Sequence, residues 1–426
     1  KLQYECSHCG APPCACTAVI YAAFFDKKVK EWWERPGLRY QQNQLYLNRV
    51  NLLEFTKNKP TPHYIYDADR IIVKYNYLFE SLAEHNDDKF RIFYAIKANR
   101  HPALLTHLRI RTNIGIDVCS PNELKLALQM GFEEPNISYT GTSLSNKDLA
   151  FLQKHFNINI NLGSISSIRR FHALAPNRPI GIRINTETGM AYAPDLEYAG
   201  AKISKFGIYE NEWQQLEDLA EVLNLKITGL HCHSGSGFLT DQLPKLTKIF
   251  EAIDRFLGLF PQIKTLNLGG GLGVPQKQDD QALDLKKWAS LVGDFAKKRG
   301  LSLAIEPGDF LVKDAGVLIS EVTTVEKKSG QLMVGLDCGM NINNEYAYYN
   351  MNLEAVPLQQ NPEAKIVETT LYGNINEPID LFSKNKPMYR LKEGQRIALL
   401  NSGGYGASSS SNHCMRGDFE EYIISK

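Results

Sequence analysis

One repeated pattern constrains the fold of this chain more than any other feature. From Phe90 onward, short β-like runs that end at Gly, Ser or Asn alternate with amphipathic helical stretches. The runs are RIFYAIKAN, NIGIDVCS, NISYTG, NINLGS, PIGIRIN, ITGLHCHSG, TLNLGGG and LSLAIEPG. Such alternation is typical of parallel strands joined by helical crossovers, and eight units close a (β/α)8 barrel. The sequence therefore predicts an α/β fold of the TIM-barrel class.

Further regions flank the predicted barrel, which we place at residues 70–310. Residues 1–44 form a cysteine-containing leader, and the segment at 45–69 predicts a strand, a helix and a second strand. After residue 310 the chain becomes mostly strand-like, with GVLISEVTTVEKK, QLMVGLD, AKIVETTLYG, QRIALLN and FEEYIIS separated by Gly, Asn and Pro. This pattern predicts a C-terminal antiparallel β domain at 311–426, against which residues 45–69 would pack.

The inward faces of the predicted strands carry ionisable side chains near the strands' C-terminal ends. Successive side chains of a strand point to opposite faces, so one face of each run is aliphatic and suits the surrounding helices. The opposite faces would bring together Lys97, Asp117, Arg183, His231, His233 and Glu306. Burying these groups is costly unless they pair or bind something, and active sites of barrels lie at this end. The pattern indicates a ligand site. The alternative is a cluster of polar side chains that hydrogen-bond one another and close this end of the barrel.

Charge and hydropathy exclude several classes of partner. The chain has 48 Lys and Arg against 47 Asp and Glu, a net charge of +1, which gives no reason to expect nucleic acid or an acidic membrane surface. The longest apolar stretch, Ala18 to Phe25, is far shorter than the roughly 20 residues of a membrane span. We expect a small-molecule substrate and neither a nucleic-acid nor a membrane partner.

The eight cysteines fall into two groups. Cys119, Cys232, Cys338 and Cys414 are scattered singly, which is typical of reduced, cytoplasmic proteins. The other four, Cys6, Cys9, Cys14 and Cys16, crowd the leader at spacings that could surround a zinc ion or could be incidental. Since nothing downstream completes a zinc module, we predict no metal.

Three motifs together indicate a phosphorylated cofactor that reacts with an amine. They are YAIKAN on the first barrel run, NLGGGLG on the seventh and AIEPG on the eighth. Consecutive glycines after a late barrel strand let backbone N–H groups approach a phosphate closely, although glycines alone would also fit a tight turn. An inward Lys and an inward Glu beside them favour the cofactor interpretation.

With DVCSPNEL, SKFGI, GLHCHSGSG and GGYG in the same order, the sequence resembles the fold-type III pyridoxal-phosphate enzymes, within them the diaminopimelate and ornithine decarboxylase group. The resemblance extends from about Leu45 to Tyr422. It implies an alanine-racemase-like barrel, pyridoxal phosphate as cofactor, and loss of the α-carboxylate of an amino acid as carbon dioxide. It also implies a homodimer in which GNINEPID and GMNINNEYAYY complete the neighbour's site.

The resemblance assigns roles to individual residues. Lys97 would form a Schiff base with the cofactor, Glu306 would keep the pyridine nitrogen protonated, and His233 would stack on the ring. Asp117, Glu123 and Arg183 would support Lys97 and the mouth. For His231 it implies no direct role, and we expect a packed, hydrogen-bonded histidine. The phosphate cradle would consist of Ser236, Gly269, Gly270, Gly271 and Tyr405.

The sequence departs from the family where the product is protonated. Relatives supply a Cys across the dimer interface in a motif Cys-Glu-Ser followed by Asp, whereas this chain has Asn376, with Glu377 and Asp380 retained. A neutral amide cannot donate a proton as a thiol does. Cys414 is our candidate for the acid, with His413 or a water as alternatives; without a substitute, turnover would be impaired.

A second departure concerns the distal end of the substrate. Diaminopimelate decarboxylases carry an Arg after EPG and another after GMN, where this chain has Asp309 and the pair Asn343 and Asn344. Each lost charge-assisted hydrogen bond is worth about 1.5–3 kcal/mol. A subsite of Asp309, Asn376 and Glu377 favours a cationic or donor distal end, as in ornithine, lysine or a conjugated diamino acid.

Other functions remain open at this point. A pyridoxal-phosphate-binding homologue with impaired catalysis and a binding or regulatory role would tolerate the loss of the acid. Diaminopimelate decarboxylase of lysine biosynthesis is a further alternative. An amino-acid racemase would share the barrel and Lys97, but it would place a neutralising or cationic partner at the pyridine nitrogen instead of Glu306.

Overall fold

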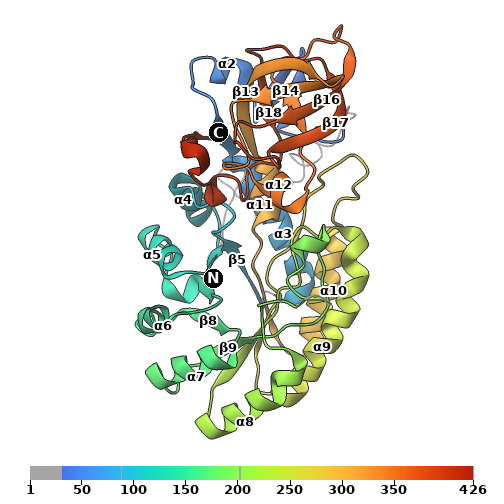
Figure 1. Cartoon of the computed structure of the whole chain (residues 1–426). Coiled ribbons are helices and arrows are strands. Elements are labelled where there is room, and N and C mark those ends of the chain that lie inside the picture. Colours follow the sequence, from blue (N-terminus) through green and yellow to red (C-terminus); the bar gives the residue numbers. More distant parts are fainter. Residues whose placement is uncertain (1–30, 88, 201–202, 426) are drawn as a thin grey trace.

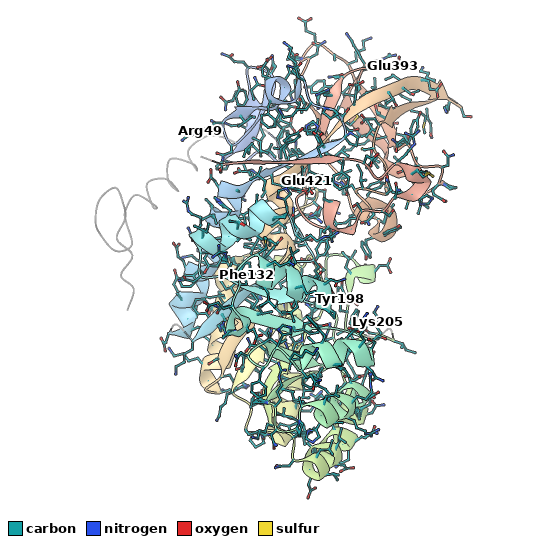
Figure 2. All side chains as sticks on the ribbon, turned by 90° about the vertical axis from the view of Figure 1, so that its left-hand side faces the viewer. Arg49, Phe132, Tyr198, Lys205, Glu393 and Glu421 are labelled. Carbon is teal, nitrogen blue, oxygen red and sulfur yellow. The ribbon has the colours of Figure 1, made fainter. Side chains whose placement is uncertain are left out.

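A computed structural model describes residues 31–87, 89–200 and 203–425. They form a barrel with a β-sheet part stacked on one end (Figure 1). Figure 2, turned by 90°, shows the same arrangement, with Phe132 in the barrel, Glu393 in the β-sheet part and Glu421 at the level where they meet. The predicted leader cysteines lie outside the described residues.

All eight predicted runs form strands of one closed parallel barrel, so the predicted fold class is confirmed. The order around the barrel is β10-β11-β12-β5-β6-β7-β8-β9, in which each strand neighbours the next along the chain and β12 closes on β5. The strands are β5 (Phe90–Ala95), β6 (Gly115–Val118), β7 (Ile137–Thr140), β8 (Asn159–Leu162), β9 (Ile180–Arg183), β10 (Ile227–His231), β11 (Thr265–Asn267) and β12 (Ser302–Ile305).

Helices cover the outside of the barrel and bury their apolar faces against the aliphatic faces of the strands. In α10, Leu285, Trp288, Val292 and Phe295 are buried at the spacing of a single helix face. Side-chain caps fix the N-termini of several helices. For example, the Ser120 side chain accepts a hydrogen bond from the Glu123 backbone N–H at the start of α5. The helices are α3 (Ala68–Asn86), α4 (Pro102–Arg111), α5 (Pro121–Gln129), α6 (Asn146–Leu152), α7 (Ile165–Leu174), α8 (Trp213–Leu223), α9 (Leu246–Leu259) and α10 (Leu285–Lys298).

The β-sheet part is mostly antiparallel, as the sequence predicts, but it also contains two parallel pairs. Its sheet runs β15-β18-β13-β14-β16-β17, and β4 (His63–Asp67) joins β13 to β19. The pairs β14–β16 and β19–β4 are parallel, and the long connections between their members permit this direction. The remaining strands are β13 (Gly316–Lys328), β14 (Gln331–Leu336), β15 (Ala355–Pro357), β16 (Ile366–Tyr372), β17 (Leu381–Tyr389), β18 (Arg396–Leu399) and β19 (Glu420–Ile424).

Short elements connect the two parts. Next to β4 lie β1 (Leu38–Gln41), β2 (Gln44–Leu47), β3 (Val50–Asn51) and α2 (Leu52–Thr56), so strand structure begins before residue 45. Between the barrel and β13 lies α11 (Asp309–Val312), and α12 (Glu345–Tyr349) follows β14. The boundaries of the proposed domains stay predictions.

A buried ionic cluster fastens the β-sheet part to the barrel. The Asp314 carboxylate accepts a hydrogen bond from Arg70 at 2.7 Å and one from Lys74 at 3.3 Å, both on α3. The Arg35 guanidinium lies 3.9 Å from the same oxygen. These three cations hold the pKa of Asp314 far below its usual range against the opposing effect of burial. The connection keeps α11 in place above the strand ends.

Candidate active site

A pocket of about 310 Å³ opens at the C-terminal ends of the barrel strands, where the β-sheet part faces the barrel. All six ionisable residues that the strand pattern predicts to converge line this pocket. Of the other candidates, Ser236, Gly270, Gly271, Asp309 and Tyr405 line it as well. The period-two interpretation of the strands thus correctly predicts that these six residues converge, whereas their roles stay predictions.

Lys97 follows β5 and is held by a carboxylate from the neighbouring strand. Its Nζ donates to Asp117 Oδ2 at 2.8 Å, and Asp117 is buried. Burial alone would lower the pKa of Lys97, but the charges of Asp117 and Tyr405 raise it well above its usual value. Burial and repulsion from Glu306 raise the pKa of Asp117 to about 7, against the opposing effect of Lys97. Asp117 is therefore a buried carboxylate whose ionised form is stabilised by Lys97.

Glu306 follows β12, and hydrogen-bond donors surround its carboxylate. Oε1 accepts from Ser138 Oγ at 2.8 Å and from Asn267 Nδ2 at 2.7 Å, while His231 Nε2 lies 3.0 Å from Oε2. Although burial opposes ionisation, His231, Lys97 and Ser138 hold the pKa of Glu306 far below its usual range. The site thus presents a fixed anion in the barrel mouth.

The donors of Glu306 include residues that the sequence analysis missed. Ser138 on β7 and Asn267 on β11 both occupy inward positions of the strand pattern, which is the signal that could have found them. His231 matches the expectation of a packed, hydrogen-bonded histidine, and its partner is Glu306. Uncharged inward residues are easily overlooked because burying an amide or a hydroxyl costs less than burying a charge.

Small residues line one side of the pocket and leave room for an anion. A Cβ on Gly271, whose φ is +96°, would lie 2.1 Å from the Gly235 carbonyl oxygen. A Cβ on Gly270 would lie 2.2 Å from the Glu306 carbonyl oxygen. The Tyr405 hydroxyl lies close above Gly308, where a Cβ would be 3.3 Å from it. Only glycine fits both central positions, as a cradle of backbone groups requires.

His233 and Arg183 complete the walls of the pocket. Burial and the nearby charges of Arg183 and Lys97 hold the pKa of His233 well below its usual value, so its ring is neutral near pH 7. The His233 ring centroid lies 4.8 Å from that of Tyr198. His233 Nδ1 and Asp117 Oδ1 are buried and have no hydrogen-bond partner among the residues that the structure describes. Such unsatisfied polar atoms fit a site that is completed by a polar, aromatic group.

The remaining candidates do not line the pocket of their own chain. Glu377 Oε1 lies 3.4 Å from His413 Nε2, and the neighbouring Cys414 is exposed. Asn376, on the same segment as Glu377, is exposed too. Asp380 fixes this segment by accepting the Met340 and Ile375 backbone N–H groups at 2.7 and 2.8 Å.

Four more sequence candidates have other hydrogen-bond partners. Asn343 Nδ2 donates to Ser402 Oγ at 3.2 Å, and Asn344 Nδ2 donates to Ser409 Oγ at 3.1 Å. Glu123 accepts the Cys119 backbone N–H at 2.8 Å. Gly269 adjoins the pocket, where its N–H donates to Asn267 Oδ1 at 2.9 Å. These contacts shape the surroundings of the pocket.

Comparison with known proteins identifies the family. A family model described as "Pyridoxal-dependent decarboxylase, pyridoxal binding domain" matches residues 69–313. The chain belongs to the pyridoxal-dependent decarboxylases. The diaminopimelate decarboxylase of Methanothermobacter thermautotrophicus is 29% identical over 396 residues, which are 90% of this chain and 91% of the relative. That of Aquifex aeolicus is 28% identical over 401 residues, 91% and 92% of the two chains.

A solved structure gives the same assignment. The diaminopimelate decarboxylase from Helicobacter pylori, complexed with L-lysine, matches this decarboxylase with a TM-score of 0.78 and 25% identity, covering 88% of this chain and 94% of the other. The chain is thus a pyridoxal-phosphate-dependent amino-acid decarboxylase. The alternative of a non-catalytic homologue has no support from these similarities. Among the described helices, none combines the length and apolar character that a bilayer crossing requires.

The residues of the pocket fit pyridoxal phosphate. When bound, the cofactor accepts the electrons that remain as the α-carboxylate leaves. Lys97 would bind its aldehyde, and Ser236 with Gly270 and Gly271 would hold its phosphate. Glu306, kept ionised by its donors, would hold a proton on the pyridine nitrogen. These residue roles stay proposals, whereas the pocket itself is a feature of the structure.

Proposed function

We propose that this decarboxylase removes the α-carboxylate of diaminopimelate. The reaction type is supported by one observation. Lys97, which is paired to Asp117, and the ionised Glu306 line the same pocket. The substrate is supported by the two relatives of 28–29% identity over nine tenths of the chain, both named diaminopimelate decarboxylases.

A second candidate is a diamino acid without a distal carboxylate, such as lysine or ornithine. The specific observation that favours it is Asp309, whose carboxylate lines the pocket where a family member would place Arg. Lys313 Nζ, 3.4 Å from Asp309 Oδ2, offsets part of the negative charge. Lys313 also pairs with Glu345, so negative charge remains near Asp309. Diaminopimelate stays the first candidate because the two relatives of 28–29% identity are named diaminopimelate decarboxylases.

Protonation of the product carbon requires an acid, and the proposal assigns it to Cys414. The thiol lies in an exposed loop next to the Glu377–His413 pair. In the proposed homodimer this loop and the Asn376 segment reach the pocket of the neighbouring subunit. The scattered described cysteines are free thiols, and a cytoplasmic location stays a prediction on that ground.

The decisive experiment compares substrates. Protein loaded with pyridoxal phosphate is incubated with meso-diaminopimelate, L-lysine and L-ornithine, and carbon dioxide release gives kcat/KM for each. The proposal expects the highest value for diaminopimelate. A higher value for lysine or ornithine would move the assignment to the second candidate. No release from any of the three, with the cofactor bound, would contradict both substrate assignments.

A complementation experiment tests the shared site. Lys97→Ala and Cys414→Ser proteins are each expected to be inactive or strongly impaired. After mixing and subunit exchange, mixed dimers contain one pocket with both Lys97 and a neighbouring Cys414, so part of the activity should return. Sedimentation of the unmodified protein as a monomer, or no recovery in the mixture despite exchange, would argue against the dimer and against Cys414.

A further inference from the structure

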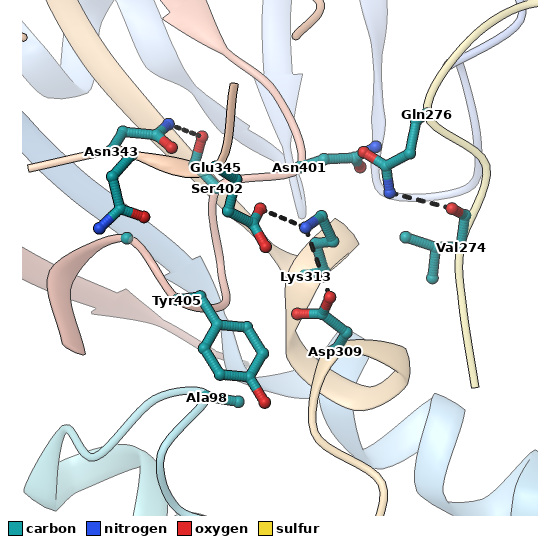
Figure 3. A network of polar contacts seen from close by, with 12 residues as sticks. Ala98, Val274, Gln276, Asp309, Lys313, Asn343, Glu345, Asn401, Ser402 and Tyr405 are labelled. Carbon is teal, nitrogen blue, oxygen red and sulfur yellow. Dashed lines mark hydrogen bonds and ion pairs between the residues drawn. The ribbon is translucent and has the colours of Figure 1, made fainter. Parts of the chain in front are cut away.

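Two carboxylates share one lysine at the junction of the barrel and the β-sheet part (Figure 3). Asp309 begins α11, Lys313 follows one helical turn later, and Glu345 begins α12. Lys313 Nζ donates to Asp309 Oδ2 at 3.4 Å and also to Glu345 Oε2. Lys313 is 2% exposed and Asp309 is 9% exposed. With both carboxylates ionised, this cluster carries one negative charge more than Lys313 can balance.

The excess negative charge contributes to a raised pKa of Glu345. Burial and the neighbouring Asp309 raise the pKa of Glu345 to about 7, although Lys313 opposes the rise. One lysine therefore does not fully satisfy the two acids. A further cation near the cluster would relieve the repulsion between them.

One oxygen of Asp309 is left without a donor. Asp309 Oδ1 is buried and makes no hydrogen bond within the described residues, while Oδ2 is the atom that Lys313 binds. Asp309 also lines the pocket that contains Lys97 and Glu306. The absence of a side chain at Gly404 keeps Oδ1 clear, because a Cβ there would lie 2.7 Å from it. A buried, unpaired carboxylate oxygen is costly unless a bound group donates to it.

We propose that Asp309 Oδ1 accepts a hydrogen bond from an ammonium group at the distal end of the substrate. The ligand class is an amino acid with a second, cationic amine. An anionic distal group alone would meet the repulsion of the cluster. The inference rests on the proposed function, and it applies to diaminopimelate and to lysine alike, because both carry a distal ammonium.

The test uses two amines that cannot be decarboxylated. Isothermal titration of the pyridoxal-phosphate-loaded protein compares 1,5-diaminopentane with 1-aminopentane, which differ in the distal ammonium alone. The unmodified protein should bind the diamine about tenfold more tightly or better, as expected of a hydrogen bond between charged groups. Asp309→Asn should lose most of that preference and bind 1-aminopentane as before. Glu80→Gln, which removes an exposed carboxylate on α3, should change neither affinity.

A second variant is needed because Asp309→Asn also removes the ion pair with Lys313. Gly404→Ala retains every charge but displaces Oδ1, so it should reduce the affinity for the diamine and spare the monoamine. Equal affinities for the two amines in the unmodified protein would overturn the inference, and so would an undiminished preference in both variants. These outcomes are separate from the proposed function, which is judged by carbon dioxide release. A preference that depends on Asp309 in a protein without turnover would uphold the inference alone.

Discussion

Replacing Asp117 by Asn tests how the protein controls the reactivity of Lys97. A lysine reacts with an aldehyde in its neutral form, whereas the 2.8 Å contact with Asp117 favours the ammonium form. Asp117→Asn removes the carboxylate charge and keeps the size of the side chain. The pKa of Lys97 should therefore fall, and more of the neutral amine should be present near pH 7.5.

The magnitude follows from the geometry of the pair. A charge-assisted hydrogen bond contributes about 1.5–3 kcal/mol in a buried setting. The Lys97 side chain is 42% exposed, so solvent screens the pair and the contribution is closer to about 1–1.5 kcal/mol. At 1.36 kcal/mol for each pKa unit, the pKa of Lys97 should fall by about one unit. The neutral fraction at a pH well below that pKa then rises up to about tenfold.

The assay follows cofactor incorporation into cofactor-free protein. The absorbance change on mixing with pyridoxal phosphate is recorded from pH 6 to 9.5 for the unmodified protein, for Asp117→Asn and for the exposed-acid control Glu80→Gln. Because this range lies below the pKa of Lys97, we expect the incorporation rate at each pH to rise, up to about tenfold, in Asp117→Asn alone. An unchanged or a lower rate in Asp117→Asn would refute the assignment of Asp117 as the partner that keeps Lys97 charged.

Three further predictions concern other parts of the site and the fold. Gly271→Ala should weaken pyridoxal phosphate binding about tenfold or more in a fluorescence titration, because the new Cβ would lie 2.1 Å from the Gly235 carbonyl oxygen. An unchanged affinity would show that Gly271 does not contribute to the phosphate site. Ser138→Ala should weaken pyridoxal phosphate binding in the same titration, because Glu306 Oε1 loses one of its two donors and its pKa rises; an unchanged affinity would show that this donor is dispensable. Asp314→Asn should destabilise the protein by about 3–5 kcal/mol at pH 7 in chemical unfolding. Since the folded-state pKa of Asp314 is lowered, that difference should shrink as the pH falls below about 4, and a difference that is constant with pH would contradict the ionic role.

The sequence predicts the barrel well because the barrel strands combine an aliphatic face toward the helices with polar or small residues on the inward face. Ile182 and Ile184 face the helices while Arg183 and Asn185 take the other face, and the same alternation recurs in the other runs. The β-sheet part is less predictable. β17 contains mostly polar residues and Pro387, which an edge strand tolerates, and β15 has three residues. Neither shows the apolar alternation on which strand prediction depends.

For the site, charged inward residues could be predicted and uncharged or distant partners could not. Lys97, Asp117 and Glu306 are conspicuous because a buried charge demands an explanation. The pairing of Lys313 with Asp309 follows from their spacing on one helix face, but Glu345 reaches Lys313 from a separate segment that sequence spacing does not relate to it. The roles of Asn376, Glu377 and Cys414 depend on a neighbouring subunit and stay predictions.

The most direct measurement asks which residue carries the cofactor. Protein loaded with pyridoxal phosphate is reduced with borohydride, digested and mapped by mass spectrometry. We expect the pyridoxyl mass on the peptide that contains Lys97, and no such label in Lys97→Ala. A label on another lysine of the unmodified protein, or none at all despite bound cofactor, would contradict the account of this pocket.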